Sequence, residues 1–307
     1  MQLSVTLPVG QAIERVKKVL FQPFDLGKWF VIGFCAWLAG LGEEGGFGSG
    51  FNYGGGNHHH SHQSVRAGLE QARDYLMHNL AWIIPLAVAL IVVSLAVWLV
   101  VLWLSSRGRF MFLHCVARNT AEVQVPWTRF AREANSLFVF RLLISLGGLA
   151  IVLPLLGGFL LVVLGMAFRE AVTPLGVVLA VALVLVLIAV GIVCWIVGWL
   201  TRDFVVPLQF VRRSLCLDAW RELVGLMRGN LGNLVLYCLF RILLAIVITA
   251  IVLAAILVTC CCAGCIMAVP YLGTVLLLPI LIFKRAYSLY YLAQFGPGYD
   301  VFAAAEG

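Results

Sequence analysis

Charge is the scarcest property of this 307-residue chain. Only 11% of its residues are charged, whereas 63% are apolar and the mean hydropathy is +1.03. Soluble domains have roughly a quarter charged and half apolar residues, because polar side chains must cover their surface. The composition therefore excludes ordinary soluble enzymes, nucleic-acid-binding domains and secreted disulfide scaffolds, and it predicts an integral membrane protein.

Sequence patterns for catalysis are also missing. The chain has no Gly-x-Ser-x-Gly elbow, no His-Glu-x-x-His zinc motif and no phosphate-binding loop. Carboxylates and histidines are absent from the interiors of the long apolar runs, where ion-coupled carriers place them. We therefore predict no enzyme activity and no cofactor. Proton- or sodium-coupled transport is disfavoured, although backbone carbonyls at a proline break could still bind a cation.

Long apolar runs are what the chain has instead. A helix needs about twenty apolar residues to cross a bilayer, because its backbone must bond internally where water is absent. Six runs are candidate spans, of which the first is the shortest. They are Leu26–Gly42, Leu80–Leu104, Leu142–Phe168, Leu175–Leu200, Ile242–Cys262 and Cys265–Phe283.

The positions of lysine and arginine predict the orientation of these spans. Bases stay on the cytoplasmic side of a membrane, whereas acids have little influence. With six spans and a cytoplasmic N-terminus, all bases except Arg66, Arg73 and Arg169 lie on the cytoplasmic side. We expect one all-α membrane domain over residues 1–307: a bundle of six transmembrane helices with interfacial amphipathic helices, both termini in the cytoplasm, in a bacterial inner membrane.

The first 25 residues predict a cytoplasmic interfacial helix. Val9, Ile13, Val16 and Leu20 recur at helical spacing, with Glu14, Arg15, Lys17 and Lys18 on the other face. Such a helix can lie on the bilayer, with its bases on anionic headgroups, or pack against the protein's own cytoplasmic segments. Both alternatives keep it on the inner face.

Two basic amphipathic segments, 105–141 and 201–241, form a degenerate parallel repeat of span, basic segment and span. In the first, Pro126 opens a helix with Trp127, Phe130, Ala131, Ala134, Leu137 and Phe138 on an apolar stripe opposite Arg129, Arg132 and Glu133. In the second, Trp220, Leu223, Val224 and Met227 form the stripe opposite Arg221, Glu222 and Arg228. Each segment ends in a matching tetrapeptide, Phe-Arg-Leu-Leu from Phe140 and Phe-Arg-Ile-Leu from Phe240. The candidate lipid- or partner-binding residues are Trp127, Arg129, Arg132, Trp220, Arg221 and Arg228.

Two clusters contain residues that bind metals elsewhere. Residues 42–79 read as an external Gly/His-rich loop and helix, in which His58–His62 holds four histidines but no fixed geometry. Cys260–Cys265 holds four cysteines at the outer end of a span, where an oxidising compartment would permit a disulfide. We expect no metal site at either, because the cysteines are equally typical of small apolar residues in a tight turn.

Motifs across most of the chain resemble those of an uncharacterised bacterial six-span membrane protein family. The resemblance is carried by the run from Phe204 to Leu208, by Trp220-Arg221, and by Arg228-Gly229-Asn230. Gly27-Lys28-Trp29-Phe30 and the tail around Tyr287–Leu292 and Phe295-Gly296-Pro297 are similar as well. The same pattern is distantly similar to the membrane domain of glycerophosphodiester phosphodiesterases, but no catalytic domain is attached. The resemblance implies an inner-membrane protein of unknown activity.

These observations predict a non-enzymatic membrane protein that acts as a scaffold or lipid-handling component. Its expected partners are the bilayer, through anionic headgroups on the basic face, and a membrane or cytosolic protein. A transporter or channel for an apolar or amphiphilic solute is the alternative, and a membrane enzyme is the third. No nucleic acid is expected as a partner.

Overall fold

The computed structural model describes residues 4–41, 62–168, 173–259, 264, 267 and 269–306. The described part is all-α, with an isolated bridge between Phe21 and Phe24 and no strand. The helices over these residues are α1 (Leu7–Leu20), α2 (Leu26–Gly40), α3 (His62–Arg118), α4 (Gln124–Arg129), α5 (Ala131–Phe168), α6 (Pro174–Leu200), the π-helix η1 (Thr201–Val205), α7 (Val206–Arg212), α8 (Cys216–Gly229), α9 (Leu231–Val258), α11 (Pro270–Leu276), α12 (Leu278–Ala293), the short 3-10 helix η2 (Pro297–Tyr299) and α13 (Val301–Glu306).

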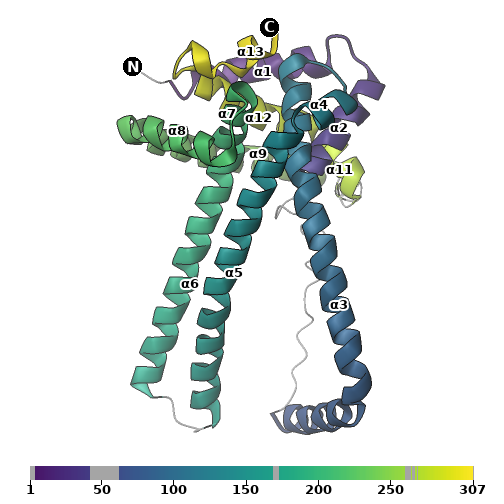
Figure 1. Cartoon of the computed structure of the whole chain (residues 1–307), viewed down its shortest axis with the longest axis vertical. Coiled ribbons are helices and arrows are strands. Elements are labelled where there is room, and N and C mark those ends of the chain that lie inside the picture. Colours follow the sequence, from purple (N-terminus) through teal and green to yellow (C-terminus); the bar gives the residue numbers. More distant parts are fainter. Residues whose placement is uncertain are drawn as a thin grey trace.

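The molecule has two contrasting parts. The short helices gather at one end into a cap; α5 and α6 extend away from it side by side, and α3 extends from it apart from them (Figure 1). Buried side chains lie in the cap, where Phe110, Tyr237 and Tyr287 are among the largest. The most apolar window of each long helix has no buried residue. A large apolar surface exposed on long helices is what lipid would cover.

Four helices in the described ranges are long and apolar enough to cross a membrane. They span Trp82–Arg118, Ala131–Met166, Pro174–Arg212 and Leu231–Val258. The protein is therefore an all-α protein with the helices of a membrane protein, and the expectation of six spans is confirmed only for these four.

The two other predicted spans form shorter helices. The first, α2, has 15 residues, which is about 22 Å of helix against roughly 30 Å of hydrocarbon. The last is divided where α11 ends and α12 begins, at Leu277, because Pro279 in the first turn of α12 cannot continue the preceding helix. Composition alone does not reveal either feature.

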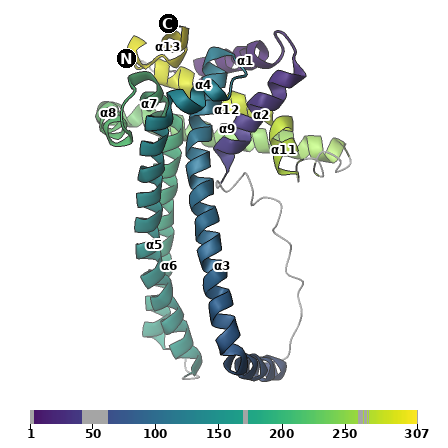
Figure 2. The same ribbon diagram turned by 45° about the vertical axis from the view of Figure 1, so that its right-hand side comes forward.

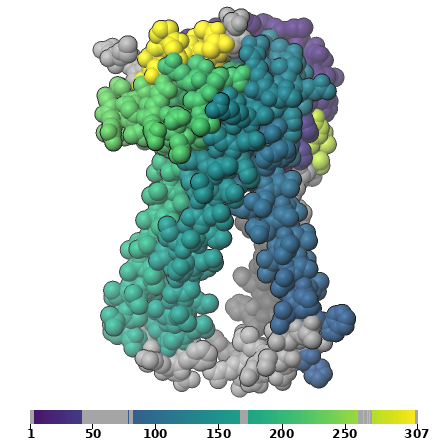
Figure 3. Space-filling model, in the orientation of Figure 1, coloured from purple at the N-terminus to yellow at the C-terminus, as the bar shows by residue number. Residues whose placement is uncertain are grey.

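The four long helices do not form one parallel bundle. Helix α5 packs along α6, and Figure 3 shows open space between the lower parts of these two helices and α3. In Figure 2, α9 runs crosswise to α5 and α6 beneath the cap. Its first turns are held there by Tyr237, which packs on Trp199, Phe204 and Tyr291.

The predicted interfacial helix exists as α1, and its buried face overlaps the predicted stripe only in part: Leu20 is buried and Val9 and Val16 are half-buried. Ala12, Arg15 and Val19 are buried, whereas Ile13 is exposed. The Arg15 guanidinium donates to the carbonyl oxygens of Val116 and Ala117, at 2.9 and 2.5 Å from Nη2. These carbonyls end α3 without helical partners, so a buried arginine satisfies them. Hence the prediction that Arg15 lies on the polar face was wrong, and the packing of α1 on α12 favours the alternative of a helix docked on its own protein.

A π-helical turn joins α6 to α7. Pro207 has no N–H, so the carbonyl of Asp203 lacks the usual donor four residues on, and the backbone widens over Thr201–Val205. Within this π-helical turn the side chain of Asp203 points inward and is only 3% exposed. The turn therefore carries an acid into the base of the cap.

Candidate functional site: a basic pocket beneath the cap

A cavity of about 120 Å³ lies where α2, α3, η1, α9 and α12 meet. Of the described residues that line it, five are bases and one is an acid. Its apolar wall comes chiefly from the end of α2, where small side chains leave room. The lining residues are the bases Arg109, Arg202, Arg241, Lys284 and Arg285, the acid Asp203, and Ala36, Ala39, Gly40, Phe112 and Leu281.

Asp203 and Arg241 form the central ion pair of this pocket. Tyr237 bonds to both, donating its hydroxyl to Asp203 Oδ2 at 3.3 Å and accepting from Arg241 Nη1 at 3.1 Å. Burying two charges is costly, but their mutual attraction and the hydrogen bonds with Tyr237 offset that cost in the low-dielectric interior. Of the described residues that line the pocket, the one acid is thereby paired with one of the five bases.

Lys284 and Arg285 form the far wall on α12. The pKa of Arg285 is lowered to about 10, chiefly by burial; Asp203 opposes this shift, and Arg109, Arg202 and Arg241 add to it. Burial, followed by repulsion from Arg241 and Arg202, also lowers the pKa of Lys284. Arg285 is 8% exposed, and its Nε has no hydrogen-bond partner among the described residues. The pocket is thus electrostatically suited to an anion.

The sequence predicts that these bases lie on the cytoplasmic side, but it did not predict that they line one cavity. They come from four elements, and the ion pair between Asp203 and Arg241 joins two of these elements. One signal was available, since Arg241 lies between Phe240 and Ile242 in an apolar run. Because α9 begins at Leu231, Arg241 lies inside a candidate span, whereas the predicted span began one residue after it, at Ile242. A charge in such a place marks a functional site by default.

The candidate residues of the first basic segment lie on the outer surface of the cap, away from the residues that line the pocket. The side chains of Arg129 and Arg132 are exposed, as predicted. Trp127 packs edge-on against Trp103, and the Arg107 guanidinium lies 4.7 Å from its ring centroid. Trp127 therefore serves packing, and the two arginines are available to ligands.

The candidate residues of the second basic segment are likewise two exposed arginines and a tryptophan that packs against another ring. Arg221 and Arg228 are exposed on α8, although Arg221 forms a surface ion pair with Asp218 at 3.4 Å. Trp220 packs on Phe140 at 5.9 Å between ring centroids. In Figure 1, α8 extends sideways from the base of the cap, beside the upper ends of α5 and α6.

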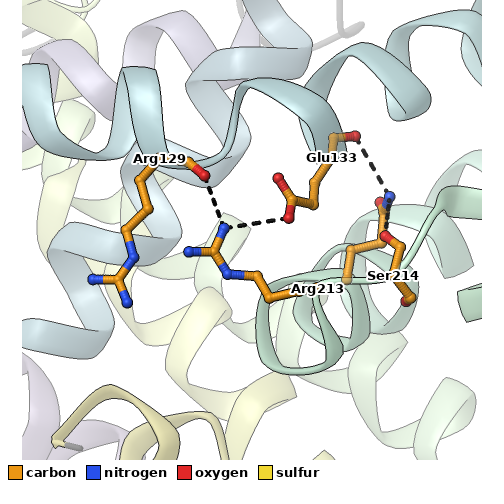
Figure 4. A network of polar contacts seen from close by, with 5 residues as sticks. Arg129, Glu133, Arg213 and Ser214 are labelled. Carbon is orange, nitrogen blue, oxygen red and sulfur yellow. Dashed lines mark hydrogen bonds and ion pairs between the residues drawn. The ribbon is translucent and has the colours of Figure 1, made fainter.

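Glu133 was expected on the polar face of its helix, and this expectation was wrong. Its side chain is buried and meets Arg213 Nη1 at 3.3 Å, as Figure 4 shows. The same nitrogen donates to the Arg129 carbonyl at 2.8 Å, and the guanidinium lies 4.1 Å from the Phe130 ring. Arg213 has a left-handed backbone conformation, which turns the chain between α7 and α8 toward α5. This junction is structural and joins the two basic segments.

The histidine and cysteine clusters lie almost wholly outside the described residues. Of His58–His62 only the helical backbone of His62 is described, and of Cys260–Cys265 only Gly264. Within the described part of the chain, no group of three or more potential ligands could hold a metal ion.

A family of unknown function, DUF7544, matches residues 3–278. The chain belongs to this family. In this DUF7544 protein the match covers the described helices from α1 to α11, and of the described pocket lining it leaves out Leu281, Lys284 and Arg285. No curated protein and no solved structure matches the chain. The similarity to the phosphodiesterase membrane domain therefore stays a resemblance.

Proposed function

We propose that this DUF7544 protein is a non-enzymatic, multi-pass membrane protein that binds anionic lipid headgroups and serves as a scaffold or lipid-handling component. The basic pocket is the observation that supports this proposal. It lies at the level where the apolar helices leave the cap, which is where headgroups would meet the protein. Basic pockets between helices at the cytoplasmic side commonly bind anionic headgroups.

The exposed arginines Arg129, Arg132, Arg221 and Arg228 extend this basic surface. Each base near an anionic surface contributes about 1 kcal/mol to attraction, and salt screens the effect. The pocket would hold one headgroup, and the outer arginines would enrich anionic lipid around the cap.

Lipid enrichment tests the proposal directly. The full chain is reconstituted in nanodiscs of phosphatidylcholine with a minority of phosphatidylglycerol, and tightly bound lipid is measured by mass spectrometry. We expect several-fold enrichment of phosphatidylglycerol, reduced when Arg129, Arg132, Arg221 and Arg228 are all replaced by glutamine. Bound lipid with the same composition as the bulk would reject the proposal.

The proposed topology has six spans, cytoplasmic termini and a bacterial inner membrane as its location. Charge asymmetry supports it, and the crosswise course of α9 makes that helix the sharpest test. In a cysteine-free background, Thr259→Cys at the end of α9 should react with an impermeant maleimide added outside intact cells. Ser4→Cys should react only after the cells are opened. Protection of both positions would show that α9 does not cross.

A further inference from the structure

Two cysteines that lie 80 residues apart in the sequence meet inside the cap. Cys35 on α2 and Cys115 on α3 are fully buried, and their sulfur atoms are 3.9 Å apart. A disulfide bond is only about 2.05 Å long, so both residues are free thiols. Cys115 Sγ also lies 3.5 Å from the carbonyl oxygen of Glu122, which makes a weak hydrogen bond. Neither the basic pocket nor the proposed function uses these two sulfurs.

The packing of α2 on α3 holds the two thiols in place. A Cβ atom at Gly108 would lie 2.6 Å from the backbone of α2, so glycine permits the two helices to approach this closely. Further along the same contact, Lys28 Nζ donates to Asn119 Oδ1 at 2.8 Å. Cys35 and Cys115 lie between these two links along both helices. The sulfurs are therefore held together by the fold itself, as a selective metal site requires.

A third sulfur belongs to the same buried cluster. Met111 precedes Cys115 by four residues, so their side chains share one face of α3. Met111 is fully buried, and it clusters with both cysteines. No three His, Cys, Asp or Glu side chains of the described residues form a metal site, but the thioether of methionine is a further ligand for soft ions. Two thiols and one thioether are thus gathered among apolar side chains.

The distance between the thiols fits a shared metal ion. A metal–thiolate bond is roughly 2.3 Å long, so an ion bound to Cys35 and Cys115 at their present separation would have an S–metal–S angle of roughly 120°. Such an angle is typical of an ion with three or four ligands. A linear ion with two ligands would need sulfurs roughly 4.6 Å apart. The geometry therefore requires at least one more ligand, and Met111 is placed to supply it.

The types of ligand indicate which ion the site would take. Structural zinc sites use four ligands, whereas the described residues offer two thiols and one thioether here. Thiolates combined with a thioether favour the soft ion Cu(I). The carbonyl oxygen of Glu122 is a hard ligand, which suits calcium or magnesium instead.

We propose that Cys35, Cys115 and Met111 form a binding site for one Cu(I) ion, which links α2 to α3. Each thiol releases its proton to water when the metal binds, and the thioether has no proton to release. The copper enters and stays as Cu(I), so binding needs no oxidant or reductant. This site goes beyond the proposed function and does not depend on it.

Competition with a chelator tests the site. The full chain contains four further thiols at Cys260, Cys261, Cys262 and Cys265, so these are replaced by serine in every protein compared. The protein is purified anaerobically in detergent and given Cu(I) bound to bicinchoninate, whose colour fades as copper leaves it. We expect the chain to remove about one Cu(I), and an equal amount of zinc should not displace it. Removal of no copper, or displacement by zinc, would overturn the proposal.

Matched cysteine variants locate the copper. Cys35→Ala with Cys115→Ala should abolish its removal from the chelator. Cys194→Ala with Cys238→Ala takes away two other thiols and should leave the removal unchanged. Binding that survives in the first variant, or that disappears in the second, would contradict the assignment.

Met111→Leu tests the third ligand and serves if the double cysteine variant does not fold. Leucine and methionine have similar volumes, so the cluster should stay packed while the affinity for Cu(I) falls about tenfold. X-ray absorption at the copper edge should show three sulfur neighbours in the parent and two in this variant. Equal affinity and equal sulfur counts in the two proteins would remove Met111 from the site.

The link between α2 and α3 has its own readout. Cu(I) should slow amide hydrogen exchange along α2, because opening this helix would then break metal bonds. Helix α8 lies on the other side of the cap in Figures 1 and 2 and is the internal control. Slower exchange in α8 to the same extent, or no change in α2, would show that copper does not join these helices.

Discussion

Arg141 and Arg241 occupy corresponding places in the two copies of the repeat, yet their surroundings differ. Arg141 Nη1 lies 3.2 Å from both Ser105 Oγ and Ser106 Oγ, at the end of the preceding apolar run. Arg241 pairs with Asp203, just after the preceding run of its own copy. In both copies the arginine thus reaches back to the start of the basic segment.

The two arginines thus have matching positions in the sequence, but among the described residues only Arg241 pairs with a carboxylate and lines the cavity. Two serine hydroxyls accept from the first arginine, and this junction also joins α3 to α2, because Ser105 Oγ donates to Ala39 O at 3.1 Å. The second copy has a carboxylate, a π-helical turn and a cavity beside it. The first junction therefore joins helices, whereas the second also borders the cavity.

Removal of Arg241 should produce the largest effect. Arg241→Ala leaves Asp203 buried without its ion-pair partner, and breaking a buried pair costs about 3–5 kcal/mol. Unfolding of the purified protein by denaturant in detergent measures this loss. Asp203→Asn combined with Arg241→Gln should recover much of the stability, because neither side chain then has an unpaired charge. Equal stability of Arg241→Ala and the parent would contradict the ion pair.

Removal of Arg141 should cost less, about 1–2 kcal/mol, since it breaks hydrogen bonds to neutral groups. Ser105 and Ser106 keep their bonds to the carbonyls of Ala39 and Leu102 after the change. The same unfolding measurement applies, with Arg141→Lys as a control that retains the charge. A loss as large as that of Arg241→Ala would remove the distinction between the two copies.

Conversion of the first copy toward the second tests the comparison further. Ser105→Asp places a carboxylate beside Arg141, so loss of Arg141 should then cost about 1 kcal/mol more than in the parent. A double-mutant cycle over Ser105 and Arg141 measures this coupling, and Ser105→Asn is the uncharged control. Coupling equal in the Asp and Asn variants would show that charge at this position does not matter.

The outer arginines should contribute least to stability. Arg129, Arg132, Arg221 and Arg228 are exposed, so each replacement by glutamine should change the free energy of unfolding by no more than about 0.5 kcal/mol. Denaturant midpoints measure this, and Arg241→Ala is the positive control. A large loss of stability would place one of these side chains in the packing of the cap.

Periodicity and charge predicted much of the framework. The long helices α5, α6 and α9 appear where apolar runs predict them, and the amphipathic patterns of α1 and α8 predict those helices. These signals are local, since a helix satisfies its own backbone and its apolar face is written in nearby residues. The exposed positions of Arg129, Arg132, Arg221 and Arg228 follow from the same periodicity.

The candidate site could not be predicted in this way. Helical spacing assigns Arg15 and Glu133 to polar faces. It cannot show that the last carbonyls of α3 lie beside Arg15, or that Arg213 approaches Glu133. Likewise, Arg241 and Asp203 are separated by 38 residues, and nothing local marks them as partners. Long-range pairing depends on how helices cross, which a single periodic pattern does not encode.

The sequence by itself determined that this is an all-helical protein suited to a membrane, because too few charges are available to cover a soluble surface of this size. It also placed the bases near the ends of the apolar runs. Only the tertiary structure decided which of them converge, since the π-helical turn, the break at Leu277 and the crosswise α9 bring five bases around one cavity. The bases around the cavity repel one another, and the packing of the buried clusters in the cap holds the helices in place against that repulsion.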